Sequence, residues 1–320
     1  MDLIYMNPDM EDVGVLKGFE IDLAFGEDEN DLECKILRSA HCCEAGWFLY
    51  MEGTEYGGII DGIEVDSEDE TIIYKGRTWH GILNSKIILP DADSDVRTLT
   101  GDATDVVNTL LADLALADLF EVAGVASDLL LEGYELDGYT PAYDAIKKML
   151  ESVGGKLLFR FNGSKVGLTV KAIKDYSADD EFDTDLVAFR FQKNYNTVNH
   201  LICVWGKEDE EKTVFHLYAD ADGNISNEQT LVGLAEVVAV QKTSAEDLEA
   251  AEKECTDAFK DLQEQAEMEF SLNDDSDSYD VGDKIGAHDS ITGISEVAII
   301  RKKIIKLTDA NVSIEYELGR

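Results

Sequence analysis

Basic residues are scarce in this chain of 320 residues. Lysine and arginine number 27 against 68 aspartates and glutamates, which leaves a formal net charge of −41. Sequence-independent binding to nucleic acid requires lysine and arginine to replace phosphate counterions, and the densest basic run is only Arg301–Lys303. A surface of this sign also repels anionic lipid headgroups. The composition argues against direct binding to DNA or to a membrane, although solubility alone is a sufficient reason for the acidity.

Long apolar runs are lacking as well. No apolar segment approaches the roughly 18 residues of a membrane-spanning helix, and residues 1–14 show neither the basic nor the apolar region of a signal peptide. The five cysteines are irregularly spaced and odd in number, so we expect reduced thiols rather than a disulfide framework. These features predict a soluble protein made in the cytoplasm.

Catalytic and cofactor motifs are also missing. The chain has no G-x-S-x-G, no H-E-x-x-H and no phosphate-binding glycine loop, and its five histidines are scattered. The carboxylates are so numerous that a pair at any spacing occurs by chance, so spacing cannot indicate glycosidase chemistry. We therefore expect no catalytic residue and no bound cofactor.

Two groups of possible metal ligands do not fit known sites. One is compact but contains adjacent cysteines, which cannot easily face a single ion, and has no C-x-x-C partner: Cys34, His41, Cys42 and Cys43. The other has alternating aspartates at 91, 93 and 95, but Val96 stands where a calcium loop requires glycine. We expect thiols buried on strands in the first case, a turn in the second, and no metal in either.

The clearest pattern in the chain lies between residues 55 and 88. Apolar and polar side chains alternate with period two over residues 59–66, an acidic run interrupts them at 67–70, and β-forming residues follow at 71–74, which predicts a hairpin. After Gly76 the apolar spacing becomes helical. Five glycines punctuate this stretch and favour bent strands or close backbone approach, as in a small curved barrel: Gly57, Gly58, Gly62, Gly76 and Gly81.

The remaining segments predict a mainly β, α+β protein. Short strands over 1–6, 19–25, 32–37 and 47–51 precede the hairpin, and the polar residues 90–95 break the pattern. Helices follow from an N-cap at Asp102 and from Thr140-Pro141, with the proline as first helical residue, and a hairpin turns at Asn162-Gly163. Beyond an acidic linker at 177–185, strands return, and a capping box of Ser244 and Asp247 begins one long helix over 245–268.

These boundaries predict three domains. Residues 1–98 form an N-terminal β-barrel-like domain, residues 99–183 an α+β domain, and residues 184–320 a second β-barrel-like domain that carries the long helix. The fold class is therefore α+β and mainly β, with two small antiparallel barrel-like domains and an α+β insert.

Several segments resemble the tail-hub proteins of siphophages and prophages. They span nearly the whole chain and are structural rather than catalytic: Tyr56–Glu64, Tyr74–Leu83, Lys193–Cys203, Tyr279–Ile285, Thr292–Ile294 and Ile314–Gly319. The resemblance implies a homotrimeric baseplate hub in the tail tip of a virion, assembled in the bacterial cytoplasm. In such a hub two barrels per subunit make a pseudo-sixfold ring between a distal tail or tube protein and a tip or spike protein. A negatively charged lumen would let DNA pass without binding it, and no direct membrane contact is implied.

Eight residues are the candidates for fold-defining and assembly roles: Gly57, Gly58, Gly76, Arg77, Trp79, Gly81, Gly282 and Asp283. Trp79 is expected to anchor the first barrel to its neighbour, and Gly282-Asp283 to lead tightly into the last barrel. Two other functions stay open. Some related prophage tail proteins are described as endopeptidases or cell-wall hydrolases, and an adhesin module would require an exposed aromatic patch, which the sequence does not indicate.

Overall fold

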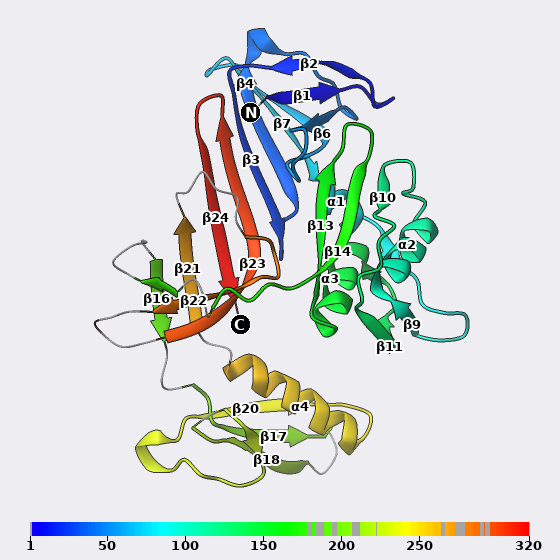
Figure 1. Ribbon diagram of the computed structural model, residues 1–320. Helices are drawn as coiled ribbons and strands as arrows, with labels where there is room; N and C mark the ends of the chain where they lie inside the picture. Colours follow the sequence, from blue (N-terminus) through cyan, green and yellow to red (C-terminus); the bar gives the residue numbers. More distant parts are fainter. Residues whose placement is uncertain are drawn as a thin grey trace. The chain divides into compact units, whose positions relative to one another are not determined.

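The structure is a computed structural model, and it describes residues 2–177, 181–183, 189–193, 197–206, 212–221, 223–263, 266–272, 279–288, 291 and 295–319. The chain forms two compact units, Met1–Phe189 with Glu269–Gly319, and Arg190–Met268 (Figure 1). The predicted class, α+β and mainly β, is confirmed. The described strands form several sheets, and none of these closes into a barrel. Within the same residues no helix has the length and apolarity needed to span a bilayer.

The largest sheet contains thirteen strands. Their spatial order is β16-β21-β24-β23-β3-β4-β7-β6-β5-β1-β2, with β22 also paired to β23 and β15 to β22. The bounds in chain order are β1 (Leu3–Met6), β2 (Asp12–Leu16), β3 (Phe19–Gly26), β4 (Asp31–Leu37), β5 (Phe48–Tyr50), β6 (Gly57–Asp66), β7 (Thr71–Thr78), β15 (Glu181–Asp183), β16 (Phe189–Lys193), β21 (Ala266–Leu272), β22 (Lys284–His288), β23 (Ser295–Thr308) and β24 (Val312–Gly319). A 3₁₀ turn, η1 (Arg38–Ala40), follows β4.

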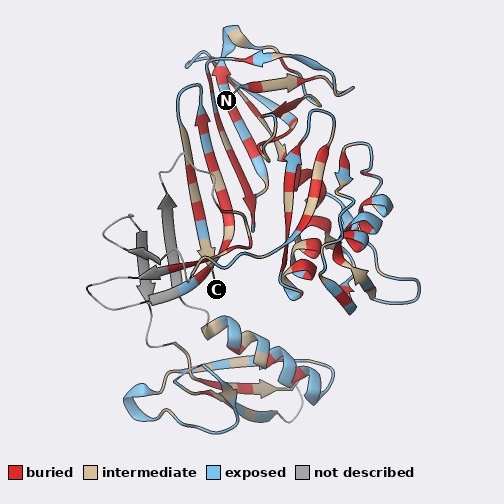
Figure 2. Cartoon of the chain, viewed as in Figure 1, coloured by how far each residue is buried: buried red, intermediate tan, exposed pale blue. Residues whose placement is uncertain are grey.

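Strands from opposite ends of the sequence pair in the middle of this sheet. β23 runs antiparallel to β3, which places Ile305 opposite Leu23 and Lys306 opposite Asp22. Buried and exposed residues alternate along the first half of β3, because successive side chains of a strand point to opposite faces (Figure 2). The apolar face packs into a core with β4 and β7, and the other face carries the charged residues discussed below.

Between β7 and β15 the chain forms an α+β segment. Its elements are α1 (Trp79–Asn84), β8 (Ile87–Ile88), β9 (Val96–Asp102), α2 (Ala103–Asp113), β10 (Phe120–Val122), β11 (Leu130–Asp137), β12 (Thr140–Pro141), α3 (Ala142–Ser152), β13 (Gly155–Phe161) and β14 (Val166–Ala172). These strands form one three-stranded sheet, β10-β14-β13, and the pairs β11-β9 and β12-β8. The helices pack their apolar stripes into one core with Trp79 and the β13–β14 hairpin.

Local signals in this segment were mostly correct. Asp102 caps α2, since its carboxylate accepts a hydrogen bond of 2.9 Å from the Thr104 amide, and the hairpin turn at Asn162-Gly163 is confirmed by the pairing of β13 with β14. The prediction for Pro141 was wrong by one position. It is the N-cap of α3 rather than the first helical residue, because its extended backbone also pairs with Ile87.

The second unit contains a four-stranded sheet and the long helix. Its elements are β17 (His200–Trp205), β18 (Thr213–Ala219), β19 (Ile225–Ser226), the 3₁₀ turn η2 (Gly233–Ala235), β20 (Val238–Thr243) and α4 (Leu248–Gln263). The sheet order is β19-β18-β17-β20, with β20 parallel and β18 antiparallel to β17. Helix α4 covers one face and buries Leu201, Cys255 and Phe259.

The long predicted helix is present, but its cap and its end differ from the prediction. It ends at Gln263 and not at residue 268, because residues 266–268 belong to β21. Asp247 accepts a hydrogen bond of 2.9 Å from the Ala250 amide, so the helix begins after Asp247, and not at Ser244. The prediction of an acidic linker over 177–185 was wrong for residues 181–183, which form β15 and pair with β22. Residues 178–180, 184–185 and 292–294 lie outside the described residues.

Candidate assembly site

Six of the eight candidate residues lie together where the β6–β7 hairpin meets α1. A side chain at Gly58 would overlap the carbonyl oxygen of Arg77 on the paired strand, and one at Gly76 would overlap that of Ile59. Gly62, by contrast, faces open space. Gly58 and Gly76 therefore allow β6 and β7 to approach each other more closely than any residue with a side chain would permit. At position 62 there is room for a side chain, so the spacing of the strands does not require glycine there.

The other two glycines of the cluster make room for α1. A side chain at Gly57 would collide with the indole of Trp79, and one at Gly81 would overlap the carbonyl oxygen of Asn30 in the β3–β4 turn. Thr78 caps the helix by accepting a hydrogen bond from the Gly81 amide at 3.3 Å. The two glycines thus let the short helix α1 lie directly against the start of β6 and the β3–β4 turn.

Trp79 joins the main sheet to the α+β segment. Its side chain is fully buried, stacks on Phe161 of β13 with ring centroids 5.7 Å apart, and lies 6.0 Å from the ring of Phe48 on β5. The contacts of Trp79 therefore lie within one chain. Burial of an indole of this size contributes a large part of the free energy that holds the main sheet and the α+β segment together.

Arg77 lies at the edge of the same cluster. Its guanidinium donates two hydrogen bonds of 2.7 Å to the carboxylate of Asp61 and a third, of 2.9 Å, to the hydroxyl of Ser85. Both partners of the ion pair are about two-fifths exposed, so the pair joins β6 to β7 and adds little stability. The hydrogen bond to Ser85 links β7 to the C-cap of α1.

Gly282 and Asp283 lie apart from this cluster, in a turn just before β22. Gly282 has φ of +98°, which favours glycine. The buried carboxylate of Asp283 accepts hydrogen bonds from the Lys156 ammonium at 2.6 Å, from the Lys174 amide at 2.9 Å and from the Asp280 amide at 3.1 Å. Lys156, only 3% exposed, also donates to the Asp280 carboxylate at 2.6 Å. This ion pair binds the turn before β22 to β13.

The two groups of candidate residues are connected through β13. Lys156 at the start of this strand holds Asp283, and Phe161 at its end stacks on Trp79. The two residues are five positions apart along the strand, or about 17 Å. Sequence analysis missed both Lys156 and Phe161. A lysine within an apolar strand pattern was the available signal, because a buried lysine requires a carboxylate partner.

One face of the main sheet is rich in carboxylates. We call it the carboxylate face, and its acidic members come from β3, β4, β6 and β24: Glu20, Asp22, Asp31, Glu33, Glu64, Glu315 and Glu317. Glu33 lies opposite Asp22 across β3–β4. Burial raises the pKa of Asp22, an effect opposed by Lys306 and reinforced by Glu315. Burial and neighbouring carboxylates likewise raise the pKa of Asp31. Lysines lie among these carboxylates: Lys75 pairs with Glu33 and Glu64, Lys302 pairs with Glu317, and Lys306 lies near Asp22 and Glu315. The face is therefore acidic overall and partly neutralised.

The densest basic run of the chain is neutralised internally. Arg301 lies near Glu27 and Glu151, Lys302 pairs with Glu29 and Glu317, and the fully buried Lys303 donates to Glu55 at 2.7 Å. Lys303 also lies 5.7–5.9 Å from the ring centroids of Phe25, Tyr56 and Tyr316. The run consequently stabilises the sheet and does not form a basic surface patch.

Among the described residues, neither the thiols nor His41, His200 and His216 are paired with a catalytic partner. The five cysteines are free, and burial raises the pKa of Cys34 to about 12. Cys42 and Cys43 lie in a loop rather than on a strand, which corrects the prediction, and Cys42 is only partly buried. Histidine hydrogen bonds go from His41 to Tyr74, and from His200 to Glu236 and His216. None of these partners is a serine or a thiol.

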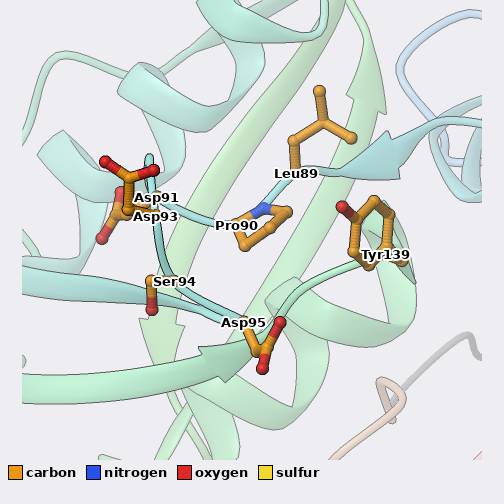
Figure 3. A pocket seen from close by; sticks show the side chains of 7 residues that line it. All are labelled: Leu89, Pro90, Asp91, Asp93, Ser94, Asp95 and Tyr139. Carbon is orange, nitrogen blue, oxygen red and sulfur yellow. The ribbon is translucent and has the colours of Figure 1, made fainter.

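The aspartates at 91, 93 and 95 form a turn, as predicted. This turn borders an open depression of about 470 Å³, lined by Leu89, Pro90, Asp91, Asp93, Ser94, Asp95 and Tyr139 (Figure 3). Asp91 accepts a hydrogen bond of 2.9 Å from the Thr98 amide, and the carboxylate of Asp95 lies well apart from those of Asp91 and Asp93 in this view. In the described part of the chain no three potential ligands converge on a metal position, here or elsewhere.

Comparison with known proteins identifies the fold. No protein-family model and no curated protein sequence matches the chain. Among solved structures, the 43 kDa tail protein of prophage MuSo2 from Shewanella oneidensis superposes with a TM-score of 0.61 at 12% identity, covering 100% of this chain and 98% of that one. The tail protein from Neisseria meningitidis MC58 gives 0.54 at 12%, covering 100% and 96%. Prophage tail protein gp18 from Listeria monocytogenes EGD-e gives 0.54 at 12%, covering 99% and 94%. The chain therefore has the fold of phage and prophage tail proteins.

Proposed function

We propose that this protein is a structural hub of a phage tail or phage-derived particle. In this proposal it forms a homotrimeric ring that joins a distal tail or tube protein to a tip or spike protein. The observation that carries the proposal is the fold, which matches three prophage or phage-type tail proteins over nearly the full length of both chains. The site of action is the tail tip of the virion, after assembly in the bacterial cytoplasm.

The buried contacts at the two ends of β13 support a structural role. Strand β13 is fixed at one end by the Trp79–Phe161 stack and at the other by the Lys156–Asp283 ion pair. Buried contacts of this kind hold the α+β segment on the main sheet as one rigid body. A ring that joins two other tail proteins requires subunits that keep their shape.

The charge of the carboxylate face supports the proposal that this face lines the DNA passage. The seven carboxylates of this face outnumber the three lysines that pair with them, Lys75, Lys302 and Lys306, and the excess negative charge repels phosphate. The basic run 301–303, which could bind phosphate, forms ion pairs within the chain. We propose that this face lines the passage and lets DNA move through without being held. The proposal requires no direct contact with a membrane.

Electron microscopy and light scattering test the ring. The purified full chain is expected to form annular particles with three times the 35.4 kDa mass of one chain, either alone or when bound to its neighbouring tail protein. A particle with a different symmetry in the assembled tail would refute the trimer. Cleavage of peptidoglycan or of a tail precursor, lost on substitution of one histidine or carboxylate, would instead favour a peptidase or hydrolase.

Charge removal tests the passage. Replacement of Asp22, Glu33 and Glu315 by their amides should slow DNA ejection from particles that carry the variant, because a less repulsive wall retains DNA longer. A matched control neutralises three exposed carboxylates on α4, at Glu249, Glu252 and Asp257, and should leave ejection unchanged. Equal ejection rates for the wild type and the first variant would remove the carboxylate face from the proposal.

A further inference from the structure

Two turns of the α+β segment meet beside the short strands β8 and β12 and form the open depression of Figure 3. One turn follows β8 and the other precedes β12. The Gly138 amide donates a hydrogen bond of 3.0 Å to the carbonyl oxygen of Asp95, and the Tyr139 amide donates one of 2.8 Å to that of Ile88. A side chain at Gly138 would overlap Pro90, so the close approach of the two turns requires glycine. The depression is therefore built by contacts between distant parts of the chain.

Large apolar and aromatic side chains at this depression are exposed to solvent. Leu89 is 60% exposed and Tyr139 is 70% exposed, and Figure 3 shows both beside the ring of Pro90. Ile87, two positions before Leu89 in the extended chain, is 45% exposed. Exposed apolar groups bordered by polar residues are typical of surfaces that bind another protein, and tyrosine is enriched in such surfaces.

The charged residues that line the depression are all acidic. They are Asp91, Asp93 and Asp95, and no lysine or arginine lines it. The carboxylate of Asp91 accepts a hydrogen bond from the Thr98 amide within the turn. No described residue donates to the carboxylate of Asp93 or of Asp95, and both residues are exposed. Arg97, the nearest basic residue in the sequence, pairs with a carboxylate of α2 instead. Two carboxylates are thus available to a ligand.

We propose that this surface binds an arginine-bearing segment of another protein. The backbone of Asp95 is hydrogen-bonded to the residue before Tyr139, so its carboxylate and the tyrosine ring border the same depression. A guanidinium stacks on an aromatic ring through its planar face and donates its N–H groups to a carboxylate, so one arginine can use both groups. Apolar neighbours of that arginine then cover Leu89. The volume of about 470 Å³ lies in the range of ligand sites in proteins.

Electrostatics determine which kind of partner fits. The carboxylates of the depression and the net charge of −41 attract a basic segment and repel an acidic one. A second copy of this chain carries the same excess of negative charge and is disfavoured for that reason. The partner is therefore a different protein with a basic binding segment. This inference does not rest on the proposed tail function.

Amide NMR spectra of the full chain, titrated with the peptide acetyl-Ala-Leu-Arg-Leu-Ala-amide, test the surface. We expect saturable shifts at the amides of Asp93, Asp95 and Tyr139. The control peptide carries citrulline, which has the shape of arginine without its charge. It should bind about fivefold more weakly or less, because hydrogen bonds to a charged donor are the stronger ones. Absence of saturable shifts at these amides in millimolar peptide, or equal affinity for the two peptides, would overturn the proposal.

Variants separate this surface from general attraction by an acidic chain. Tyr139→Asn removes the ring and suits the backbone φ of +63°, which asparagine adopts more readily than tyrosine. The affinity for the arginine peptide should fall by about 2- to 30-fold, the range of a cation–π contact. Asp93→Asn with Asp95→Asn should also weaken binding. The control neutralises two exposed carboxylates in the β6–β7 turn, Glu68→Gln with Asp69→Asn, and should bind as the wild type does.

Two results would assign the binding elsewhere. Equal weakening by the two pairs of charge substitutions would show that the peptide responds to net charge rather than to this depression. Self-association of the free chain in light scattering, lost in Tyr139→Asn, would assign the surface to a second copy. Either result would refute the proposal.

Discussion

The buried ion pair between Lys156 and Asp283 offers the sharpest test of the architecture. Asp283→Asn removes the charge opposite a lysine whose side chain is 3% exposed, while the amide oxygen can still accept from a backbone N–H. Breaking a buried pair from one side costs about 3–5 kcal/mol. Lys156 keeps its contact with the partly exposed Asp280, so we expect the lower end, about 3 kcal/mol. Against a total stability of about 5–15 kcal/mol, that loss is large.

Three further variants separate the loss of the ion pair from the loss of the backbone hydrogen bonds at Asp283. Asp283→Ala should cost about 1–3 kcal/mol more than the asparagine, because the amides of Lys174 and Asp280 then lose their acceptor. Lys156→Met with Asp283→Asn should be more stable than Asp283→Asn alone, since no buried ammonium is then left with only the partly exposed Asp280 as its partner. Lys17→Met, at an exposed pair, is the control and should leave unfolding unchanged.

Urea unfolding followed by tryptophan fluorescence measures these differences in the first unit. The chain has three tryptophans, and Trp47 and Trp79 belong to that unit while Trp205 belongs to the second. A Trp205→Phe background therefore confines the signal to the unit that contains the ion pair. A loss below about 1 kcal/mol for Asp283→Asn would refute the claim that this pair clamps the turn before β22 to β13.

Three other outcomes are expected. Gly76→Ala should destabilise the first unit strongly, because its Cβ would overlap a backbone carbonyl, and Gly62→Ala, which faces open space, should not; similar melting temperatures for the two would contradict this. Asp102→Ala should cost more than the roughly 1 kcal/mol of an ordinary N-cap, since Asp102 also accepts from the amide and hydroxyl of Ser127, as thermal unfolding will show. Burial holds the pKa of His80 well below its usual range in the folded chain. In the unfolded chain the same imidazole takes up a proton near pH 6.5, so the free energy of unfolding should fall as pH drops below about 6.5. A His80→Phe variant should lose that part of the pH dependence, and an unchanged profile would contradict the assignment.

Elements with local signals could be predicted from the sequence. The β6–β7 hairpin was predicted from period-two alternation before an acidic turn and β-forming residues after it, and the structure pairs residues 58–66 with 71–78. The apolar parity did not give the buried face, because Ile63 and Val65 are exposed. The β13–β14 hairpin was predicted from Asn162-Gly163, and α2 from Asp102. Strands β9 and β11 were not predicted. Gly133 interrupts the alternation of β11 at a register shift between Glu132 and Tyr134, so the periodic signal is broken where the strand continues.

The sites depended on contacts between distant parts of the chain. Lys156 and Asp283 are 127 positions apart, and the depression beside Tyr139 joins a turn that follows β8 to one that precedes β12. No periodicity or motif reports which residues meet over such separations. Sequence analysis therefore singled out Gly282-Asp283 for its turn without finding Lys156, and interpreted the aspartates at 91, 93 and 95 as a turn without finding Tyr139. The assembly roles of the eight candidate residues stay predictions.

The sequence by itself determined the acidity, the lack of catalytic motifs, the mainly β class and the helices with clear caps, because each depends on composition or on neighbours within a few residues. Only the tertiary structure decided that β23 pairs with β3, that the basic run is spent on internal ion pairs and that carboxylates gather on one sheet face. Those features arise when strands far apart in the sequence lie side by side, and their register then sets which charges meet.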